Sequence, residues 1–133
     1  MVATRLHEVP CVSLRFFNVY GPRQDPSSPY SGVISRFAEA ISRKSPIEIH
    51  GDGGQVRDFV FVEDVVDALL KAMQSVRRLG PGIFNVCTGR ATSIRDLALG
   101  MRASVGANVS VNFFPPRAGD IRVSIGDPSK ARK

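Results

Sequence analysis

Short apolar runs typical of β-strands alternate along this chain with amphipathic helical segments, and this alternation constrains the fold more than any other feature. Apolar residues at helical spacing predict helices over residues 31–43, 63–77 and 93–104. The runs that predict strands cover residues 10–17, 46–50, 57–62, 83–87 and 109–113. Strands that alternate with helices indicate an α/β fold, in which helices pack against a mostly parallel sheet.

The helix predicted over residues 63–77 begins with two acidic residues and ends with two arginines, which suits the helix dipole. Its apolar stripe is expected to face the core and consists of Val65, Leu69, Ala72, Met73 and Val76. The helix predicted over residues 93–104 follows Thr92 and Ser93, and one of these two hydroxyls is expected to cap its first turn.

Stretches rich in Gly, Pro, Asn and Ser predict the loops. The longest loops are expected from Asn18 to Pro29 and from Pro115 to about residue 127, the second with a short extended piece at 122–125. The Gly-rich stretch Gly51–Gly54 predicts a turn. Its glycines lack the spacing of a dinucleotide-binding or Walker loop. The first nine residues resemble the end of a helix and the last six the start of one, so we expect an element to be cut at both ends.

The composition is that of an ordinary globular domain, with 133 residues of which 43% are hydrophobic and 23% charged. No apolar run approaches the roughly 18 residues that a membrane span needs. The N-terminal residues lack the apolar region of a signal peptide. These features predict a cytoplasmic protein without a membrane partner.

The net charge of +6 admits nucleic acid as a partner. However, the basic residues are scattered, and the clusters Arg77-Arg78 and Lys130–Lys133 are short. No aromatic residues interleave with them, as a platform for single-stranded nucleic acid would require. A surface that binds the phosphates of a small ligand explains the charge equally well, so no nucleic-acid partner is expected.

Cys11 and Cys87 each lie in an apolar strand-like run, and both are expected to be buried free thiols. A zinc site needs more ligands than these two thiols provide. Since His7 and His50 are not spaced as their partners, no metal is expected.

Four stretches resemble, in order and spacing, the C-terminal half of the extended short-chain dehydrogenase/reductase family, in particular its NAD-dependent nucleotide-sugar epimerases and dehydratases. They are Leu14–Gln24, Gly51–Asp64, Phe84–Gly89, and Arg117–Arg122 followed by Asp127–Ala131. Residues 24–34 most resemble UDP-sugar 4-epimerases, including those that act on N-acetylated sugars. The resemblance implies the last elements of a Rossmann-type parallel sheet plus a small α/β nucleotide-sugar-binding subdomain. Residues 1–133 would then be the C-terminal part of the domain, without its N-terminal NAD-binding part.

Such epimerases hold NAD on a Gly-rich loop, and the Tyr of a Tyr-x-x-x-Lys pair removes a proton from the sugar hydroxyl. Neither feature is present in this sequence: Tyr20 is followed four residues later by Gln24, and Tyr30 by Ile34. We therefore assign no catalytic residue. NAD is the cofactor that the resemblance implies, although its main binding motif is absent from this chain.

Arg57 is the first candidate for binding the diphosphate of a UDP-sugar. It leaves a Gly-rich turn and enters a predicted strand, so a stiff element would position its guanidinium, whose planar fork suits phosphate oxygens. The resemblance matches it to the family's diphosphate arginine. The alternative is a surface arginine paired with Asp58 or Glu63.

Arg117 and Asp120 form a second candidate pair, because the family's Arg-x-Gly-Asp motif contacts the diphosphate and the ribose at this place. Pro115-Pro116 stiffens the approach to this loop, and Gly119 permits its turn. The alternative is an exposed polar loop without a ligand. Arg122 is a weaker candidate.

Asn18, Gly32 and Val33 complete the predicted substrate-binding set. Asn18 follows a buried strand at its C-terminal end, where ligands of open α/β sheets bind, and the family's Asn contacts phosphates there. The alternative is that Asn18 caps its own loop. The resemblance matches Gly32 and Val33 to a helix start whose backbone contacts uracil.

Four other residues near these positions are given no chemistry. Some relatives carry an aromatic residue and an Asn on the strand over residues 46–50, from which the family holds the nucleotide, whereas this chain has Glu48 and His50 there. Phe37 lies one turn beyond Val33 and is interpreted as a core residue. Asn85 is expected to bind the backbone at a strand end.

The sequence thus predicts the C-terminal substrate-binding portion of a UDP-glucose or UDP-N-acetylglucosamine type 4-epimerase, inactive alone. One alternative is a non-catalytic UDP-sugar-binding module or a subunit of a split enzyme. Another is a fragment of a nucleotide-sugar dehydratase or decarboxylase. The oligomeric state and the sugar stay open, and so does the nucleotide beyond a preference for UDP.

Overall fold

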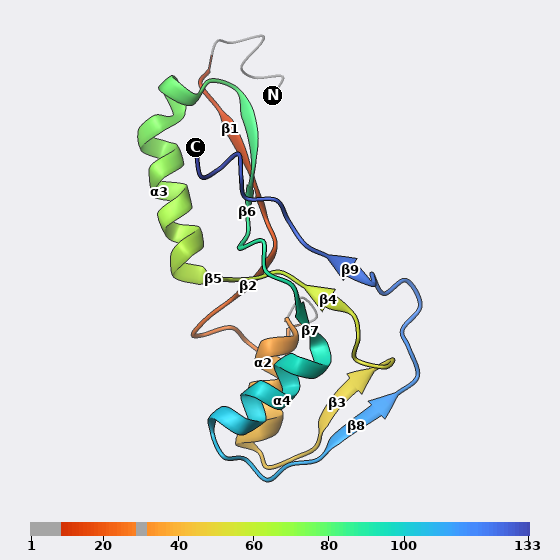
Figure 1. Ribbon diagram of the computed structural model, residues 1–133. Helices are drawn as coiled ribbons and strands as arrows, with labels where there is room; N and C mark the ends of the chain where they lie inside the picture. Colours follow the sequence, from red (N-terminus) through yellow and green to blue (C-terminus); the bar gives the residue numbers. More distant parts are fainter. Residues whose placement is uncertain (1–8, 29–31) are drawn as a thin grey trace.

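The structure is a computed structural model that describes residues 9–28 and 32–133. One end of the molecule is built on the parallel pair β1 (Val12–Phe16) and β6 (Gly82–Val86), and helix α3 (Val62–Leu79) packs against it (Figure 1). Parallel neighbours need a crossover, and α3 lies in the one that joins these strands. Its core contains Val60, Val65 and Val86, with Leu14, Val19 and Ala68 packed against them.

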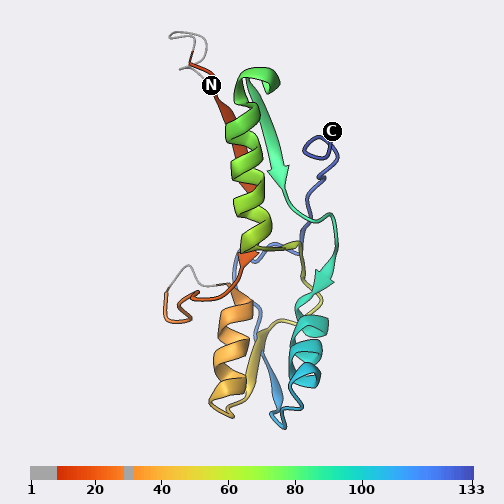
Figure 2. The same cartoon turned by 90° about the vertical axis from the view of Figure 1, so that its left-hand side faces the viewer.

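The other end carries a second parallel pair, β3 (Ile47–His50) and β8 (Val111–Phe114). Helices α2 (Val33–Ser42) and α4 (Ile94–Ser104) contact each other and cover one face of this pair (Figures 1 and 2). The larger core of the molecule lies between them and consists of Phe37, Ile47, Ile49, Ile94, Ala98 and Val109.

Short strands join the two ends. β2 (Asn18–Tyr20) pairs in parallel with β5 (Phe59–Phe61). β4 (Val56–Arg57) lies between β7 (Thr92–Ser93), which is antiparallel to it, and β9 (Val123–Ser124), which is parallel. The α/β class with parallel strands is confirmed, and the predicted strands and helices, except the strand over residues 57–62, are present within a few residues of their expected bounds.

The stretch predicted as one strand over residues 57–62 is two strands that belong to different sheets. The chain changes sheet at Asp58, whose buried side chain binds backbone and hydroxyl groups of Thr88, Gly89 and Gly126 instead of pointing out of a pleat. The prediction of a single strand was therefore wrong, because these partners lie about 30 and 68 residues away.

The predicted loop from Asn18 to Pro29 begins with a strand instead. β2 forms because the backbone amide of Asn18 donates to Asp58 O at 3.0 Å, while Val19 packs in the core beside β5. Residues 29–31 of this loop, with the start of the predicted helix over 31–43, lie outside the described residues. The helical end predicted for the first nine residues lies outside them as well, except Val9.

The predicted inward stripe of α3 was partly wrong. Val65 and Ala68 face the core, whereas Leu69 and Met73 are exposed. The cysteines also differ from expectation, because Cys11 and Cys87 form no disulfide, as expected, but are only half-buried. Each lies just beyond a strand end, where fewer neighbours cover it.

The ends of the helices agree with the sequence. The hydroxyl of Ser93 accepts a hydrogen bond from the amide of Asp96 at 2.9 Å and caps α4. At the C-terminus, the amide of Ala131 donates to Pro128 O at 2.9 Å and closes one helical turn.

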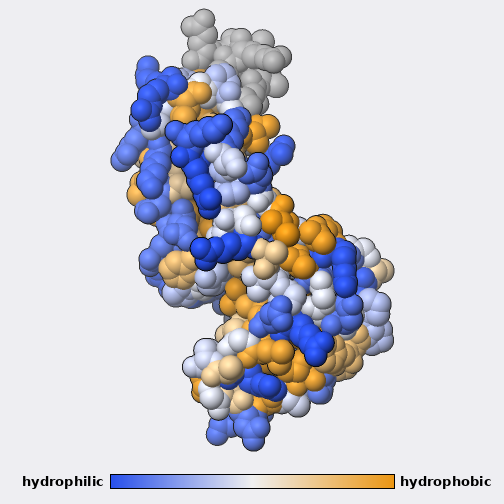
Figure 3. Space-filling view, in the orientation of Figure 1, coloured by the Kyte–Doolittle hydropathy of each residue, from blue (hydrophilic) through white to orange (hydrophobic). Residues whose placement is uncertain are grey.

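Figure 3 shows apolar surface gathered around β9, where the side chains of Ile121, Val123 and Ile125 are exposed.

Candidate functional site

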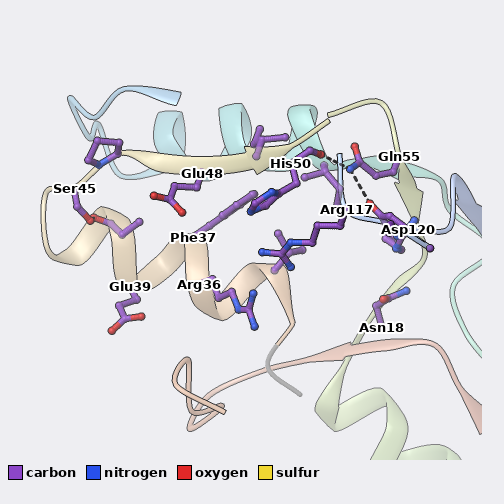
Figure 4. A pocket seen from close by; sticks show the side chains of 18 of the residues that line it. Asn18, Arg36, Phe37, Glu39, Ser45, Glu48, His50, Gln55, Arg117 and Asp120 are labelled. Carbon is purple, nitrogen blue, oxygen red and sulfur yellow. Dashed lines mark hydrogen bonds and ion pairs between the residues drawn. The ribbon is translucent and has the colours of Figure 1, made fainter. Parts of the chain in front are cut away.

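A cavity of about 650 Å³ lies between α2, β3 and the loop over residues 117–120. It is lined by five of the six predicted substrate-binding residues, which come from four separate segments: Asn18, Val33, Arg57, Arg117 and Asp120. Gly32 does not line it, but it is the residue that precedes α2 and forms its N-cap. Figure 4 shows the cavity with the side chains of α2 on one side and those of β3 and the loop on the other.

Arg57 and Asp120 bind each other. Nη2 of Arg57 lies 2.6 Å from Oδ1 of Asp120, and Nη1 donates to the carbonyls of Ile121 at 2.5 Å and Val56 at 2.9 Å. The Arg57 side chain is only 16% exposed. Neither Asp58 nor Glu63 is its ion-pair partner, so a rigid guanidinium faces the cavity with the loop attached to it.

Gln55 is a site residue that the sequence analysis missed. Its Nε2 donates to His50 O at 2.6 Å and to Oδ2 of Asp120 at 3.0 Å (Figure 4). Its buried Oε1 accepts no hydrogen bond within the described part of the chain. The available signal was an amide side chain at the end of the Gly-rich turn, two residues before Arg57. Gln55 and Arg57 therefore hold both oxygens of Asp120.

Three further arginines line the cavity, and one of them, Arg43, is paired with Glu39 at 2.8 Å, which leaves two guanidinium groups to consider. Arg117 comes from the loop and Arg36 from α2, one turn after Val33, and Figure 4 shows both side chains at the cavity. No carboxylate of the described residues forms an ion pair with either. Helical spacing from Val33 would have identified Arg36, which the sequence analysis did not consider. Cations without carboxylate partners suit an anionic ligand such as a phosphate.

Asn18 lies at the cavity, and its side chain binds a distant segment instead of capping its own loop, which was the alternative considered for it. It lines the cavity, and its Nδ2 donates to Asp58 O at 3.1 Å, beside the bond from its own backbone amide. The side chain is therefore fixed at the C-terminal side of β1, at the edge where a ligand is expected.

Strand β3 contributes Glu48 and His50 to the lining of the cavity. This side is therefore less apolar than in the relatives that carry an aromatic residue there. Glu48 is exposed, and Nδ1 of His50 lies 3.2 Å from Pro115 O with its ring tilted against Phe114. Phe37 lines the cavity but is buried in the core, as expected. Nδ2 of Asn85 donates to Asp127 O at 3.2 Å, so its predicted backbone role is confirmed.

Arg122 lies outside this cavity. It forms an exposed, bidentate pair with Asp52, with N–O distances of 2.6 and 3.0 Å, and lines a second cavity of about 470 Å³. The hydrogen bonds from Arg122 lower the pKa of Asp52 to about 2. Arg122 thus fastens the loop over residues 115–122 to the turn after β3 and is occupied in doing so.

Replacing Gln55 by methionine is expected to destabilise the protein by about 1–3 kcal/mol, because similar volume is kept while two buried hydrogen bonds are lost. The midpoint of urea unfolding measures this. Gln74→Met on the exposed face of α3 is the matched control, with an expected change within about 0.5 kcal/mol. Equal effects of the two changes would contradict the role of Gln55.

The Gly-rich turn over Gly51–Gly54 does not fit a dinucleotide-binding loop. It leads from β3 into β4 rather than into a helix, so it offers no helix N-terminus to a pyrophosphate.

The described residues hold no group of three or more possible metal ligands, and none of their helices is both long and apolar enough to cross a membrane.

Comparisons with known proteins agree on one family. The sequence model of the NAD dependent epimerase/dehydratase family matches residues 2–87. UDP-glucose 4-epimerase of Mycolicibacterium smegmatis is 43% identical over 96% of this chain and 40% of its own length. A UDP-N-acetyl-alpha-D-glucosaminuronate decarboxylase of Bacillus cytotoxicus is 37% identical over 70% of this chain and 28% of its own length.

Solved structures of the same kind share the fold. The crystal structure of UDP-glucose 4-epimerase of Thermotoga maritima with UDP-glucose superimposes with a TM-score of 0.88 at 39% identity. The superposition covers 97% of this chain and 40% of that protein. The chain therefore spans about two fifths of the length of the 4-epimerases that it matches.

Proposed function

Because the chain belongs to the NAD-dependent epimerase/dehydratase family, we propose that it is the UDP-sugar-binding portion of a nucleotide-sugar 4-epimerase. Residues 1–133 would correspond to the C-terminal part of the family's domain. The observation that carries the proposal is the single cavity that collects Asn18, Arg57, Arg117 and Asp120. A cleft in which several arginines converge beside the carboxylate of Asp120 suits a ligand that has both phosphates and hydroxyls.

Each polar group has a task in this proposal. Arg57 uses three of its five N–H donors within the protein, which leaves two for the diphosphate. Arg36 and Arg117 add charge from opposite sides of the cavity. Asp120 keeps lone pairs that accept from the ribose hydroxyls. We assign the contact with the base to the backbone of Val33, which lines the cavity, and of Gly32 before it.

The affinity follows from these contacts. A charge-assisted hydrogen bond contributes about 1.5–3 kcal/mol, and micromolar binding needs about 8 kcal/mol. Three such contacts, from Arg57, Arg36 and Arg117, therefore support a dissociation constant in the micromolar range. The fixed position of Arg57 reduces the entropy that binding would otherwise cost.

The proposal assigns binding and no chemical step to this chain. NAD supplies hydride transfer in whole members of the family, whereas this sequence has neither the dinucleotide loop nor a Tyr-x-x-x-Lys pair. We expect the isolated chain not to interconvert UDP-galactose and UDP-glucose when NAD is added. Turnover by the purified chain would contradict this expectation.

Isothermal titration of the chain with UDP tests the proposal directly. UDP is expected to bind at micromolar concentration, and NAD is not expected to bind. Arg117→Ala should weaken UDP binding about 10- to 100-fold, since one charge-assisted contact is lost. Arg77→Ala, at the exposed end of α3 and in the lining of neither cavity, is the control and should change it less than about twofold. Absence of UDP binding to the wild-type chain would refute the proposal.

A second candidate is a non-catalytic UDP-sugar-binding module or a subunit of a split enzyme. It rests on the same cavity as the first proposal. A fragment of a nucleotide-sugar decarboxylase is the other alternative. It predicts tighter binding of UDP-glucuronate than of UDP-glucose, which the same titration measures.

A further inference from the structure

The Gly-rich turn between β3 and β4 receives the guanidinium group of Arg122. Gly51 and Gly53 have φ angles of +77° and +73°, a backbone conformation that glycine adopts without strain. A Cβ atom at Gly54 would lie 2.6 Å from Nη2 of Arg122, so the missing side chain makes room for the guanidinium. Asp52 binds both terminal nitrogens of this group, at 2.6 and 3.0 Å. The turn is therefore shaped around one arginine of the chain itself.

This turn is held in place by the start of α4. The carbonyl of Gly53 accepts a hydrogen bond from the amide of Arg95 at 2.9 Å, and the neighbouring residue Ile94 is buried in the larger core. The amide of Gly54 donates to Oδ1 of Asp52 at 2.9 Å, which orients the carboxylate. Arg122 therefore binds to a turn whose position does not depend on the loop that carries this arginine.

The loop over residues 115–122 depends on such attachments because it has few neighbours. All of its residues are exposed, and a Cβ atom at Gly119 would meet nothing within 4 Å. Segments with few packing contacts open at a low cost in free energy. Arg117 lies in the middle of this loop, so its place at the cavity depends on what holds the loop at its ends.

The bonds of Asp120 to Arg57 and Gln55 hold the loop inside the larger cavity. In the proposed function Arg57 and Asp120 also contact the nucleotide, so the ligand competes for these bonds. By contrast, neither Asp52 nor Arg122 lines the larger cavity. Their ion pair is therefore an attachment of the loop for which the ligand does not compete.

We propose that Asp52, Gly54 and Arg122 form a positioning site, in which the Gly-rich turn holds Arg122 and thereby keeps Arg117 at the cavity. Its effect on nucleotide binding rests on the proposed function, whereas its effect on the loop does not. Exposed ion pairs contribute little stability, and the side chains of Arg122 and Asp52 are 64% and 65% exposed. This pair is bidentate and bound to a fixed turn, so it acts on the position of the loop more than on the stability of the fold.

Trypsin cleavage after Arg117 in the ligand-free chain measures how firmly the loop is held. Gly54→Ala adds a methyl group where the guanidinium lies, and Asp52→Asn removes the charge that binds it. Both substitutions should accelerate this cleavage about fivefold or more, as followed by mass spectrometry. The matched controls are Gly100→Ala, where a Cβ atom meets nothing within 4 Å, and Asp67→Asn on the exposed face of α3. Equal cleavage rates in the variants and their controls would overturn the inference.

Isothermal titration with UDP measures the consequence for binding. Gly54→Ala and Asp52→Asn should each weaken UDP binding about 3- to 10-fold, which is less than the loss expected for Arg117→Ala, and both controls should leave it unchanged. In a chain that already carries Arg117→Ala, Asp52→Asn should weaken binding less than about 1.5-fold further, because Asp52 acts through Arg117.

Two results of the titration would overturn the inference. One is that the effects of Asp52→Asn and Arg117→Ala on UDP binding multiply, since a purely structural role of Asp52 would give this result. The other is faster cleavage without any loss of affinity. If the wild-type chain binds no UDP, the proposed function is refuted, whereas the cleavage rates still decide whether the turn holds the loop.

Discussion

Replacing Arg57 by glutamine is expected to weaken UDP binding roughly 100-fold. Glutamine keeps part of the side chain's length and polarity but removes the charge and the planar fork, and a charge-assisted contact is worth about 1.5–3 kcal/mol. The change also releases Asp120 and the carbonyl of Ile121, so the loop that carries Arg117 loses an attachment. Isothermal titration with UDP measures the loss, and the circular dichroism spectrum checks that the variant is folded.

Arg95→Gln is the matched control, because Arg95 is exposed and does not line the cavity. Its affinity for UDP should equal that of the wild type. Arg57→Lys separates charge from geometry: it should recover part of the affinity but less than all of it, since an ammonium group cannot form the fork. If Arg57→Gln bound UDP as tightly as Arg95→Gln, the cavity would not be the diphosphate site.

The pairing of Arg57 with Asp120 shows how far sequence reasoning reaches. Both residues were predicted as ligands of one nucleotide sugar, and the structure places both at one cavity. That they bind each other across 63 positions, with Gln55 on the second carboxylate oxygen, could not follow from local spacing. Loop residues such as Asp120 acquire their neighbours from tertiary structure, because no periodic pattern constrains them.

Helix α3 shows the same limit for the fold. Helical periodicity correctly predicted the helix, but two apolar stripes run along it. One faces the core through Val65 and Ala68, and the other is exposed and includes Val66, Leu70 and Met73. The pattern that selected Val65 with Leu69 and Met73 mixed the stripes, because position 69 lies between them on the helix surface. Which stripe faces the core depends on the strands that pack beneath it, and these come from segments before and after the helix.

Asp58 is expected to contribute most to stability among the polar residues. Its side chain is 0% exposed and accepts bonds from the amide and hydroxyl of Thr88 at 2.8 and 2.7 Å, the amide of Gly89 at 2.8 Å and that of Gly126 at 3.3 Å. It therefore joins the loop after β6 and the segment after β9 to the point where the chain changes sheet. The amide of Asn18 donates to its backbone carbonyl, so the same residue also positions the cavity.

Asp58→Ala is expected to lower the free energy of unfolding by roughly 3–5 kcal/mol, because several buried donors lose their acceptor at once. Asp58→Asn should lower the free energy of unfolding somewhat less, since its carbonyl oxygen still accepts from Thr88. Its amide group cannot accept from the remaining donors, so part of the loss stays. Urea unfolding measures both variants. Asp67→Asn on the exposed face of α3 is the control, with an expected change within about 0.5 kcal/mol.

The pH dependence gives an independent check on Asp58. Burial by itself would raise the pKa of Asp58, but the hydrogen bonds from Thr88, Gly89 and Gly126 outweigh it and hold the pKa below its ordinary value. A carboxyl whose pKa is lower in the folded state stabilises the protein above its unfolded pKa of about 3.9, and this contribution is lost as the pH falls through the folded pKa. The stability difference between the wild type and Asp58→Asn should therefore be constant from neutral pH to about pH 5 and shrink below it. A difference that stayed constant down to pH 2 would mean that the charge of Asp58 does not stabilise the fold.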